Sequence, residues 1–276
     1  MKKDPVELAK TVGQVYDKKA IIYKNANENL KEIFTKYNIK NKDVLTVLAS
    51  SDQALSFYYA KAKTIDTFDR NYLTLYYYYL RKWLILYKNQ LYPSHKFINF
   101  TGNGDIELYH LVCSIIPQSD KEKEAQIFWK KFMEYNEYKS NFLFEDRYCL
   151  EDKPFDNEIE KIKNFFDNEV TFNNIDITEP VYLNKQYDIV YLSNMLEYEE
   201  VEDKRNIVKN NLENLLKSNG IVICTYKIRN KKDDWHKAEV NDLTTGYLKL
   251  DNEYSYYEPL IGGKKDLAYS YKKRSK

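Results

Sequence analysis

The stretch VLTVLASSDQALSFYYAKAKTIDTFDRN, residues 44–71, decides the fold of this chain. Its apolar, partly β-branched run from Val44 to Leu48 is typical of a buried parallel strand. Ser50 and Gln53 have the spacing of a capping box, so we expect a helix to begin at once and to continue to about residue 59. Residues 64–68 then form a second strand. A strand, a helix and a strand within about 30 residues predict a right-handed βαβ unit, which binds ligands at the carboxyl ends of its strands.

Asp69 stands at the end of the second strand, well beyond the turn that follows the first strand. A carboxylate in that position can accept hydrogen bonds from the ribose hydroxyls of a nucleotide. The alternative role for Asp69 is to cap the helix that contains Tyr72. The loop from Leu48 to Asp52 holds no glycine, although nucleotide-binding folds commonly place glycines there. Its small serines and the N–H groups of the following helix start still leave room for a ligand.

Apolar residues spaced at three and four predict helices over residues 5–37 and 71–91, on either side of the βαβ unit. Two further helices are expected in the long segment that follows, with residues 101–104 as a turn, and another helix over 156–167. Strands are then expected at 169–176, 189–192 and 221–228, and the amphipathic helix before the last of these is expected to end at Gly220. Two weaker strands, 247–250 and 267–271, flank Gly262 and Gly263 and predict a terminal hairpin.

From residue 43 to about residue 227, the order of these features resembles the class I S-adenosylmethionine-dependent methyltransferases, a family that shares a seven-stranded sheet. VLTVLASSD matches the first strand and its loop, and TIDTFD matches the second strand with its acidic ribose ligand. VTFNNIDIT matches the third strand, which is followed by an acid beside the adenine. YDIVYLSNMLEY matches the fourth strand, which is followed by small polar residues, and NLLKSNGIVICTY matches the turn before the fifth strand and the strand itself.

The resemblance implies an α/β fold with a Rossmann-like, doubly wound, mostly parallel seven-stranded sheet. We expect a single S-adenosylmethionine-binding domain over residues 1–276. Residues 1–42 would supply N-terminal helices. Residues 92–165 would form a helical insertion before the third strand, which is a candidate substrate cap.

The same resemblance implies S-adenosylmethionine as cofactor and a transferase activity, most simply methyl transfer to a small or medium-sized acceptor. Asp52 or Gln53 would meet the ammonium or the carboxylate of the methionine part. Glu197 and Tyr198, at the place of a frequent L-E-H motif, are the candidate catalytic residues; otherwise they open the next helix. The implied cofactor-binding residues are Ala49, Ser50, Ser51, Asp52, Gln53, Asp69, Arg70, Asn71, Asp176, Ile177, Ser193 and Asn194.

The chain departs from the family's pattern in its first strand and loop, where Thr46 replaces the usual acid and the glycines are missing. Two alternatives therefore stay open. The loop, the long helix after Asp69 and the large insertion also resemble the 3-amino-3-carboxypropyl transferases of betaine-lipid synthesis and, more distantly, nicotianamine synthase, which use the same cofactor. The second alternative is a non-catalytic binding or scaffold protein that keeps the fold.

Composition argues against several other classes. Lys and Arg number 43 against 42 Asp and Glu, so net charge offers no general attraction to nucleic acid or to an anionic membrane. Asp4 and Glu7 interrupt any signal-peptide core, and no apolar run approaches the roughly 18 residues of a membrane helix. Cys113, Cys149 and Cys224 are odd in number and widely spaced, which fits reduced thiols and predicts a cytoplasmic protein.

Other site chemistries lack their motifs. The first loop contains neither the G-x-G-x-x-G of NAD-binding domains nor the G-K-[ST] of a P-loop. His95, His110 and His236 are scattered along the chain, so no metal site is expected. The expected partner is a small-molecule substrate, and the oligomeric state is left open. The 27 tyrosines carry an apolar ring with a polar tip, so they can replace Phe or Leu at half-buried positions.

Overall fold

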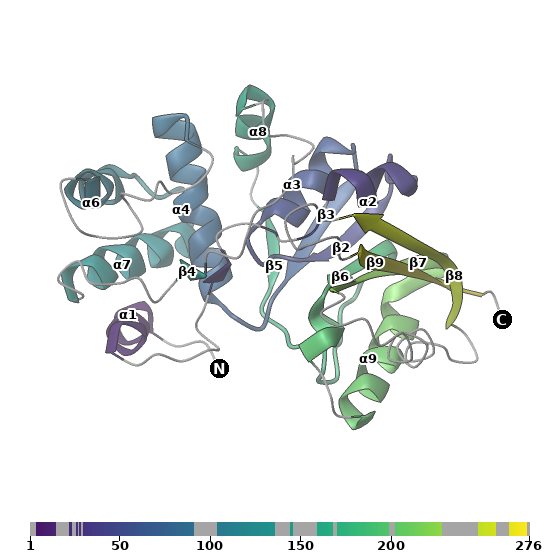
Figure 1. Cartoon of the computed structure of the whole chain (residues 1–276). Helices are drawn as coiled ribbons and strands as arrows, with labels where there is room; N and C mark the ends of the chain where they lie inside the picture. Colours follow the sequence, from purple (N-terminus) through teal and green to yellow (C-terminus); the bar gives the residue numbers. More distant parts are fainter. Residues whose placement is uncertain are drawn as a thin grey trace.

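The computed structural model describes residues 4–14, 22–23, 26, 28, 30–90, 104–135, 144–145, 159–167, 170–198, 202–227, 248–257 and 265–274 (Figure 1). A central sheet has helices on both faces, and a group of further helices lies beyond one of its edges. The predicted turn residues 101–103 and the hairpin glycines Gly262 and Gly263 lie outside the described residues, whereas Gly104 begins helix α6.

The main sheet has seven strands in the order β5-β3-β2-β6-β7-β9-β8. The first five in this order are parallel, and β9 is antiparallel to both of its neighbours. The expected fold class is confirmed: the chain winds outward in both directions from β2 and builds a mostly parallel α/β sheet. The bounds are β2 (Asp43–Val47), β3 (Thr64–Phe68), β5 (Thr171–Asn173), β6 (Tyr187–Ser193), β7 (Leu216–Lys227), β8 (Leu248–Tyr257) and β9 (Lys265–Lys273).

Strands β2 and β6 are neighbours although about 140 residues separate them, as their paired residues Val44 and Ile189 show. The chain order reverses between these two strands. In open α/β sheets such a reversal opens a crevice outside the carboxyl ends of the strands, because the two connections leave toward opposite faces. The crevice of this sheet is therefore expected between the loop that follows β2 and the residues that follow β6.

Both faces of the sheet are buried under helices. Val44 and Tyr191 face α2 (Leu30–Lys36) and α3 (Asp52–Tyr59), together with Phe34 and Phe57 of those helices. Alternate residues such as Leu45 face α9 (Glu202–Leu215) on the other side. Because successive side chains of a strand point to opposite faces, central strands with two buried faces need nearly continuous apolar sequence. This explains why the sequence located β2, β3 and β6 within one or two residues.

A third core lies between α4 (Leu73–Lys88) and the helices around it, which are α1 (Pro5–Gln14), α6 (Gly104–Ser114), α7 (Asp120–Tyr135) and α8 (Ile159–Phe166). Helix α4 is buried on almost every side, and Tyr76, Tyr77, Tyr78 and Tyr79 are at most 2% exposed. These tyrosines are therefore fully buried and not half-buried. A helix that is apolar all round belongs in an interior, and tyrosine rings supply that apolar area here.

Two element predictions need correction. Residues Ile22–Tyr23, expected to be helical, form strand β1, which pairs in parallel with β4 (Phe144–Glu145) as a separate two-stranded sheet. The helix expected to end at Gly220 ends at Leu215, and β7 begins at the next residue. In both places a tertiary pairing partner overrides the local helical pattern.

Gly220 has a packing role instead of a capping role. A Cβ atom at this position would lie 2.9 Å from the carbonyl oxygen of Tyr187 and 3.0 Å from that of Lys217. Real Cβ atoms do not approach backbone oxygens this closely, so only glycine lets β7 pass β6 at this point. The sequence singled out Gly220 correctly, but its role is steric and not that of a helix cap.

The amino ends of the strands are held by ion pairs. Lys217 Nζ lies 2.6 Å from Asp43 Oδ2 and 3.0 Å from Asp188 Oδ2, and Lys185 Nζ lies 2.8 Å from Asp66 Oδ2. The carboxylates at this edge thus have lysine partners within the chain. Among the helices that the structure describes, none has both the length and the apolar character to cross a membrane.

Candidate functional site

Asp69 fastens the carboxyl end of β3 to the loop that follows β2. Its Oδ2 accepts a hydrogen bond from the backbone N–H of Ala49 at 3.1 Å, and its Oδ1 accepts one from the N–H of Asn71 at 2.8 Å. Burial raises the pKa of Asp69 to about 6, although these two hydrogen bonds act in the opposite direction. Each carboxylate oxygen keeps a further lone pair, so the half-buried group can still accept hydroxyl hydrogens.

The alternative role of Asp69 as a helix cap is not what the geometry shows. Asn71 Oδ1, and not Asp69, accepts the N–H of Leu73 at the start of α4. Asp69 instead shapes the turn before the helix through the N–H of Asn71. The two predicted site residues therefore have different roles. Asn71 accepts a hydrogen bond at the start of α4, and Asp69 lies at the carboxyl end of β3 and fixes the turn between them.

The second predicted acid, Asp176, lies beside the first. Arg70 Nη1 is 3.7 Å from Asp176 Oδ2, and both side chains are partly exposed. Asp176 Oδ1 also accepts the N–H of Thr178 at 3.0 Å and its hydroxyl at 2.7 Å, so the carboxylate is held in a tight turn after β5. The structure thus brings Asp69, Arg70 and Asp176 together at the carboxyl edge of β3 and β5.

Ile177, expected among the cofactor-binding residues, is 1% exposed and belongs to the apolar core under α9. Its carbonyl oxygen accepts a hydrogen bond from Asn211 Nδ2 at 2.7 Å. In the structure as it stands, this side chain contributes to packing next to Asp176.

The glycine-free loop keeps the backbone conformation that glycine favours. Ala49 has φ 41° and Ser51 has φ 73°, both in the left-handed region. Left-handed backbone costs an L-residue about 1 kcal/mol or more, so the surrounding structure must hold the loop in this shape. The expected capping box is wrong: α3 begins at Asp52, its N-cap is Ser51, and no side chain caps it.

A buried arginine holds this loop. Arg81, from the middle of α4, is completely buried, and its Nη1 donates to the carbonyl oxygen of Ser50 and to Asp52 Oδ1, the latter at 3.0 Å. Asp52 Oδ2 accepts the backbone N–H of Ala26 at 2.5 Å. Both oxygens of Asp52 therefore have partners within the chain. The ion pair with Arg81 and the hydrogen bond from Ala26 therefore both hold the loop in place.

Ala26 and Glu28, from the N-terminal part of the chain, lie beside the loop that follows β2 and the end of β6. Glu28 is 2% exposed, and its carboxyl accepts hydrogen bonds from Gln53 Nε2 at 3.2 Å and from Ser193 Oγ. Thr225 Oγ1, on β7, lies at a longer 3.5 Å. Two residues predicted to bind a ligand, one from each side of the crevice, therefore meet on a side chain of this chain.

The remaining predicted residues lie after β6. Ser193, with φ 56°, ends the strand in left-handed backbone, and its hydroxyl lies 3.4 Å from Asn194 Oδ1. Glu197 and Tyr198 belong to a short 3-10 helix, Met195–Tyr198, which fits the alternative that they open the next element; their side chains lie outside the described part of the structure.

Sequence reasoning missed Ala26, Glu28 and Arg81. Arg81 had one usable signal, because a charged residue in the middle of an apolar helix must find a buried partner. Glu28 had no such signal: it lies in a polar stretch far from β2 in sequence, and only the fold places it over the strand ends.

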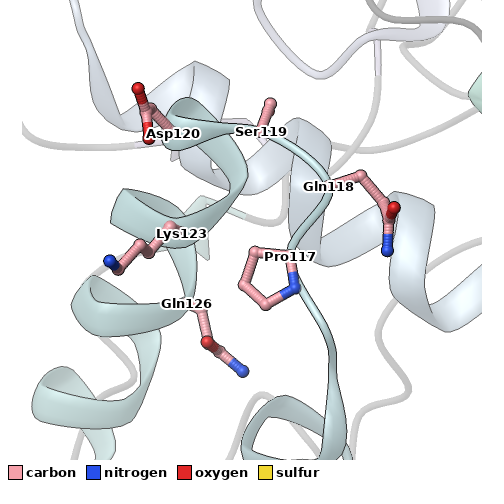
Figure 2. A pocket seen from close by; sticks show the side chains of 6 residues that line it. All are labelled: Pro117, Gln118, Ser119, Asp120, Lys123 and Gln126. Carbon is pink, nitrogen blue, oxygen red and sulfur yellow. The ribbon is translucent and has the colours of Figure 1, made fainter.

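A shallow surface hollow lies away from these residues (Figure 2). It is lined by the loop between α6 and α7 and by the first turns of α7, from Pro117 to Gln126. None of the predicted site residues lines it. Figure 2 shows that Asp120 and Lys123 come from the same short segment. Because all of its lining residues come from this segment, we do not treat the hollow as a binding site.

Comparisons with known proteins find similarity in three-dimensional structure alone. No family model matches the sequence, and no curated protein matches it. Among solved structures, the N-methyltransferase NodS from Bradyrhizobium japonicum WM9 in complex with S-adenosyl-l-homocysteine has a TM-score of 0.41 and 9% identity, over 99% of this chain and 100% of that chain. TrmN from Thermus thermophilus has a TM-score of 0.41 and 8% identity, over 88% of this chain and 48% of that chain.

An rRNA methylase from Streptococcus thermophilus has a TM-score of 0.40 and 5% identity, over 91% of this chain and 100% of that chain. Similarity at this level does not indicate which cofactor or acceptor this chain binds. The fold assignment rests on the order and direction of the strands in the chain itself.

Proposed function

We propose that this chain is an S-adenosylmethionine-dependent transferase, most simply a methyltransferase that acts on a small or medium-sized acceptor. The observation that carries the proposal is the position of Asp69. Its carboxylate stands at the carboxyl end of β3, hydrogen-bonded to the loop that follows β2, 20 residues earlier in the chain. That is the place where a parallel sheet of this kind holds the ribose of a nucleotide.

The residues present fit the nucleoside part of the cofactor. Asp69 is half-buried and has acceptor capacity left for ribose hydroxyls, and Asp176 with Arg70 offers polar groups beside it. The residues proposed for the methionine part, Ser50, Ser51, Asp52 and Gln53, are at most 2% exposed. A ligand reaches them only if the covering segment at Ala26 and Glu28 moves.

The proposed chemistry asks little of the protein. A sulfonium is already an activated methyl donor, so the chain needs to align the acceptor with the methyl group and to remove a proton where the acceptor carries one. Ser193 and Asn194 stand at the strand end that faces the crevice, and Glu197 and Tyr198 follow in the 3-10 helix. We propose Glu197 and Tyr198 as candidates for the proton transfer, while Ser193 and Asn194 are proposed as cofactor contacts.

The insertion is proposed to take part as a substrate cap. The hydroxyl of Tyr72, at the start of α4, donates to Glu124 Oε2 of α7 at 3.3 Å. This contact joins α7 to the start of α4, three residues after Asp69, and supports a role of the insertion next to the proposed site. The net charge of the chain is close to zero, which gives no general attraction to a nucleic acid and supports the choice of a small acceptor.

A second candidate function is a non-catalytic binding or scaffold protein that keeps the fold. The observation in its favour is the burial of the loop that follows β2, because Asp52, Gln53 and Ser193 all have partners from the chain itself. A protein that never binds the cofactor has no need to leave these groups accessible.

Ligand-induced thermal stabilisation separates these candidates. The unfolding temperature would be measured with S-adenosylmethionine, S-adenosylhomocysteine and NAD, since a ligand at 100 times its dissociation constant adds about 2.7 kcal/mol. We expect stabilisation by the first two ligands and none by NAD. No shift with any of them favours the scaffold. Once an acceptor is found, S-adenosylhomocysteine as product indicates methyl transfer, and methylthioadenosine indicates aminocarboxypropyl transfer.

A further inference from the structure

Beyond the carboxyl ends of β2 and β6, a set of hydrogen-bond donors converges on a carboxyl group. Gln53 Nε2 comes from the first turn of α3, Ser193 Oγ from the end of β6, and Thr225 Oγ1 from β7. The carboxyl group that they meet belongs to Glu28. The donor residues are 2%, 5% and 1% exposed, so the set is a built interior feature and not a surface coincidence.

We propose that these three side chains form a carboxylate-binding cradle and that Glu28 fills it as an internal occupant, which an external ligand bearing a carboxylate must displace. The cradle draws on three separate elements at the switch point of the sheet. Amide and hydroxyl groups are the donors that neutral carboxylate sites use, and a carboxylate accepts several such bonds at once.

The segment that carries Glu28 is attached to the loop at a second point. The backbone N–H of Ala26 donates to Asp52 Oδ2 at 2.5 Å, and Asp52 is held in turn by Arg81. Ala26 and Glu28 are therefore attached beyond the ends of β2 and β6, Ala26 through its backbone and Glu28 through its side chain. When Glu28 and Ala26 move away, the Ala26 backbone contact and the Glu28 side-chain contacts are both lost. A ligand whose carboxylate binds Gln53 and Ser193 replaces the side-chain contacts.

The closed state explains why the loop is buried although its backbone has the shape of a ligand-binding loop. Ala49 and Ser51 keep left-handed backbone angles, while Ser50, Ser51, Asp52 and Gln53 are at most 2% exposed. Strained backbone that the surroundings hold in place is enriched at ligand-binding sites, which supports a ligand role for this loop. The closed form then lowers the apparent affinity of any ligand by the fraction of molecules that are open.

The identity of the ligand rests on the proposed function, because S-adenosylmethionine and S-adenosylhomocysteine both carry a free α-carboxylate. The cradle itself does not rest on it. Small carboxylates such as acetate and formate test the cradle alone, and S-adenosylhomocysteine tests whether Glu28 competes with the cofactor.

The experiment compares the wild-type chain with Glu28→Ala, which empties the cradle, and with Glu28→Gln, which keeps the shape but removes the charge. Glu160→Gln is the matched control, because Glu160 lies exposed on α8 and pairs only locally with Lys163. Unfolding temperatures would be measured in acetate and formate against chloride at equal ionic strength. The dissociation constant of S-adenosylhomocysteine would be measured for each variant by calorimetry.

We expect acetate and formate to raise the unfolding temperature of Glu28→Ala but not that of the wild-type chain or of Glu160→Gln. The dissociation constant of S-adenosylhomocysteine should fall about tenfold in Glu28→Ala, as expected when an open state of about 10% becomes dominant. It should fall by a smaller factor in Glu28→Gln, which serves as the deciding variant if Glu28→Ala does not fold.

Two results overturn the inference. Equal effects of acetate on the wild-type chain and on Glu28→Ala would show that no cradle was emptied. Unchanged or weaker binding of S-adenosylhomocysteine by both Glu28 variants would show that Glu28 is not a competitor, while the proposed function survives. If neither the wild-type chain nor the variants bind S-adenosylhomocysteine, the proposed function fails, and the acetate measurement still decides the cradle.

Discussion

Asp69 Oδ2 accepts the backbone N–H of Ala49 at 3.1 Å, so the acid that ends β3 is attached to the loop that follows β2. This contact links the position of the carboxylate to the shape of the loop, which Arg81 also holds through Ser50 and Asp52. Asp69 is also a titratable group at the position that we propose for the nucleoside, so the proposed site should depend on pH.

The pKa of Asp69, raised to about 6 by burial, predicts how stability and ligand binding vary with pH. The folded protein binds this proton more tightly than the unfolded chain, so the stabilisation from Asp69 is complete below about pH 4 and is lost as pH rises through about 6. The loss amounts to at most about 3 kcal/mol, at 1.36 kcal/mol per pKa unit.

Urea unfolding of the wild-type chain and of Asp69→Asn between pH 4 and pH 8 measures this effect. The free energy of unfolding of the variant, relative to wild type, should increase over the window from pH 4 to pH 6 and stay level above it. A parallel pH profile for the two proteins would contradict the assignment. Affinity for a ribose-containing ligand should rise through about pH 6 in the wild-type chain, because the ionised carboxylate is the better acceptor of hydroxyl hydrogens.

The left-handed backbone of Ser51 predicts a stabilising substitution. Ser51→Gly should raise the free energy of unfolding by about 1 kcal/mol, since glycine adopts φ 73° without strain. The Ser51 hydroxyl is also buried without a hydrogen-bond partner among the described residues, so its removal leaves no bond broken.

Ser56→Gly is the matched control for Ser51→Gly. The Ser56 hydroxyl is likewise buried without a partner in the part of the chain that the structure describes, but Ser56 lies inside α3 in right-handed backbone. Glycine in a helix interior should lower the free energy of unfolding by about 1 kcal/mol. Shifts of the same sign in the two variants would refute the role assigned to the backbone of Ser51.

The buried contact between Arg81 and Asp52 predicts a large loss of stability when one partner is removed. Arg81→Met leaves the Asp52 carboxylate buried without its cation and should lower the free energy of unfolding by about 3–5 kcal/mol. Lys163→Met breaks the exposed contact with Glu160 and should change it by less than about 1 kcal/mol. A loss below about 1 kcal/mol for Arg81→Met, measured by urea unfolding, would mean that the loop does not depend on this contact.

Gly220 predicts a steric effect at the pairing of β6 and β7. Gly220→Ala places a Cβ atom 2.9 Å from the carbonyl oxygen of Tyr187, so the strands must separate, at a cost of about 1–3 kcal/mol. Ser218→Ala, on an exposed residue of the same connection, should change stability by less than about 0.5 kcal/mol. Equal effects of the two substitutions in thermal unfolding would contradict the close approach.

The sequence predicted the sheet well because central parallel strands carry their own signal. β3 was located at its observed bounds, and β2 and β6 within one or two residues, since buried strands need continuous apolar runs that few other elements share. Strand β1 escaped prediction because two residues have no readable period, and they become a strand only by pairing with Phe144–Glu145.

The candidate site was predicted in part, for a related reason. Asp69 and Asp176 follow strands, so their place at one sheet edge follows from the topology. Asp52 and Gln53 were assigned to a ligand because the loop was considered alone. Their actual partners, Arg81 and Glu28, come from a helix 29 residues later and a segment 25 residues earlier, and no local pattern links them.

The most direct test of the central claim is a calorimetric titration of the wild-type chain and of Asp69→Ala with S-adenosylhomocysteine. The account predicts saturable binding to the wild-type chain and none to a variant that still unfolds cooperatively. Asp69→Ala should be less stable by about 1–3 kcal/mol, because the N–H groups of Ala49 and Asn71 lose their acceptor. Absence of binding to the wild-type chain at millimolar ligand, or equal binding to both proteins, would contradict the account.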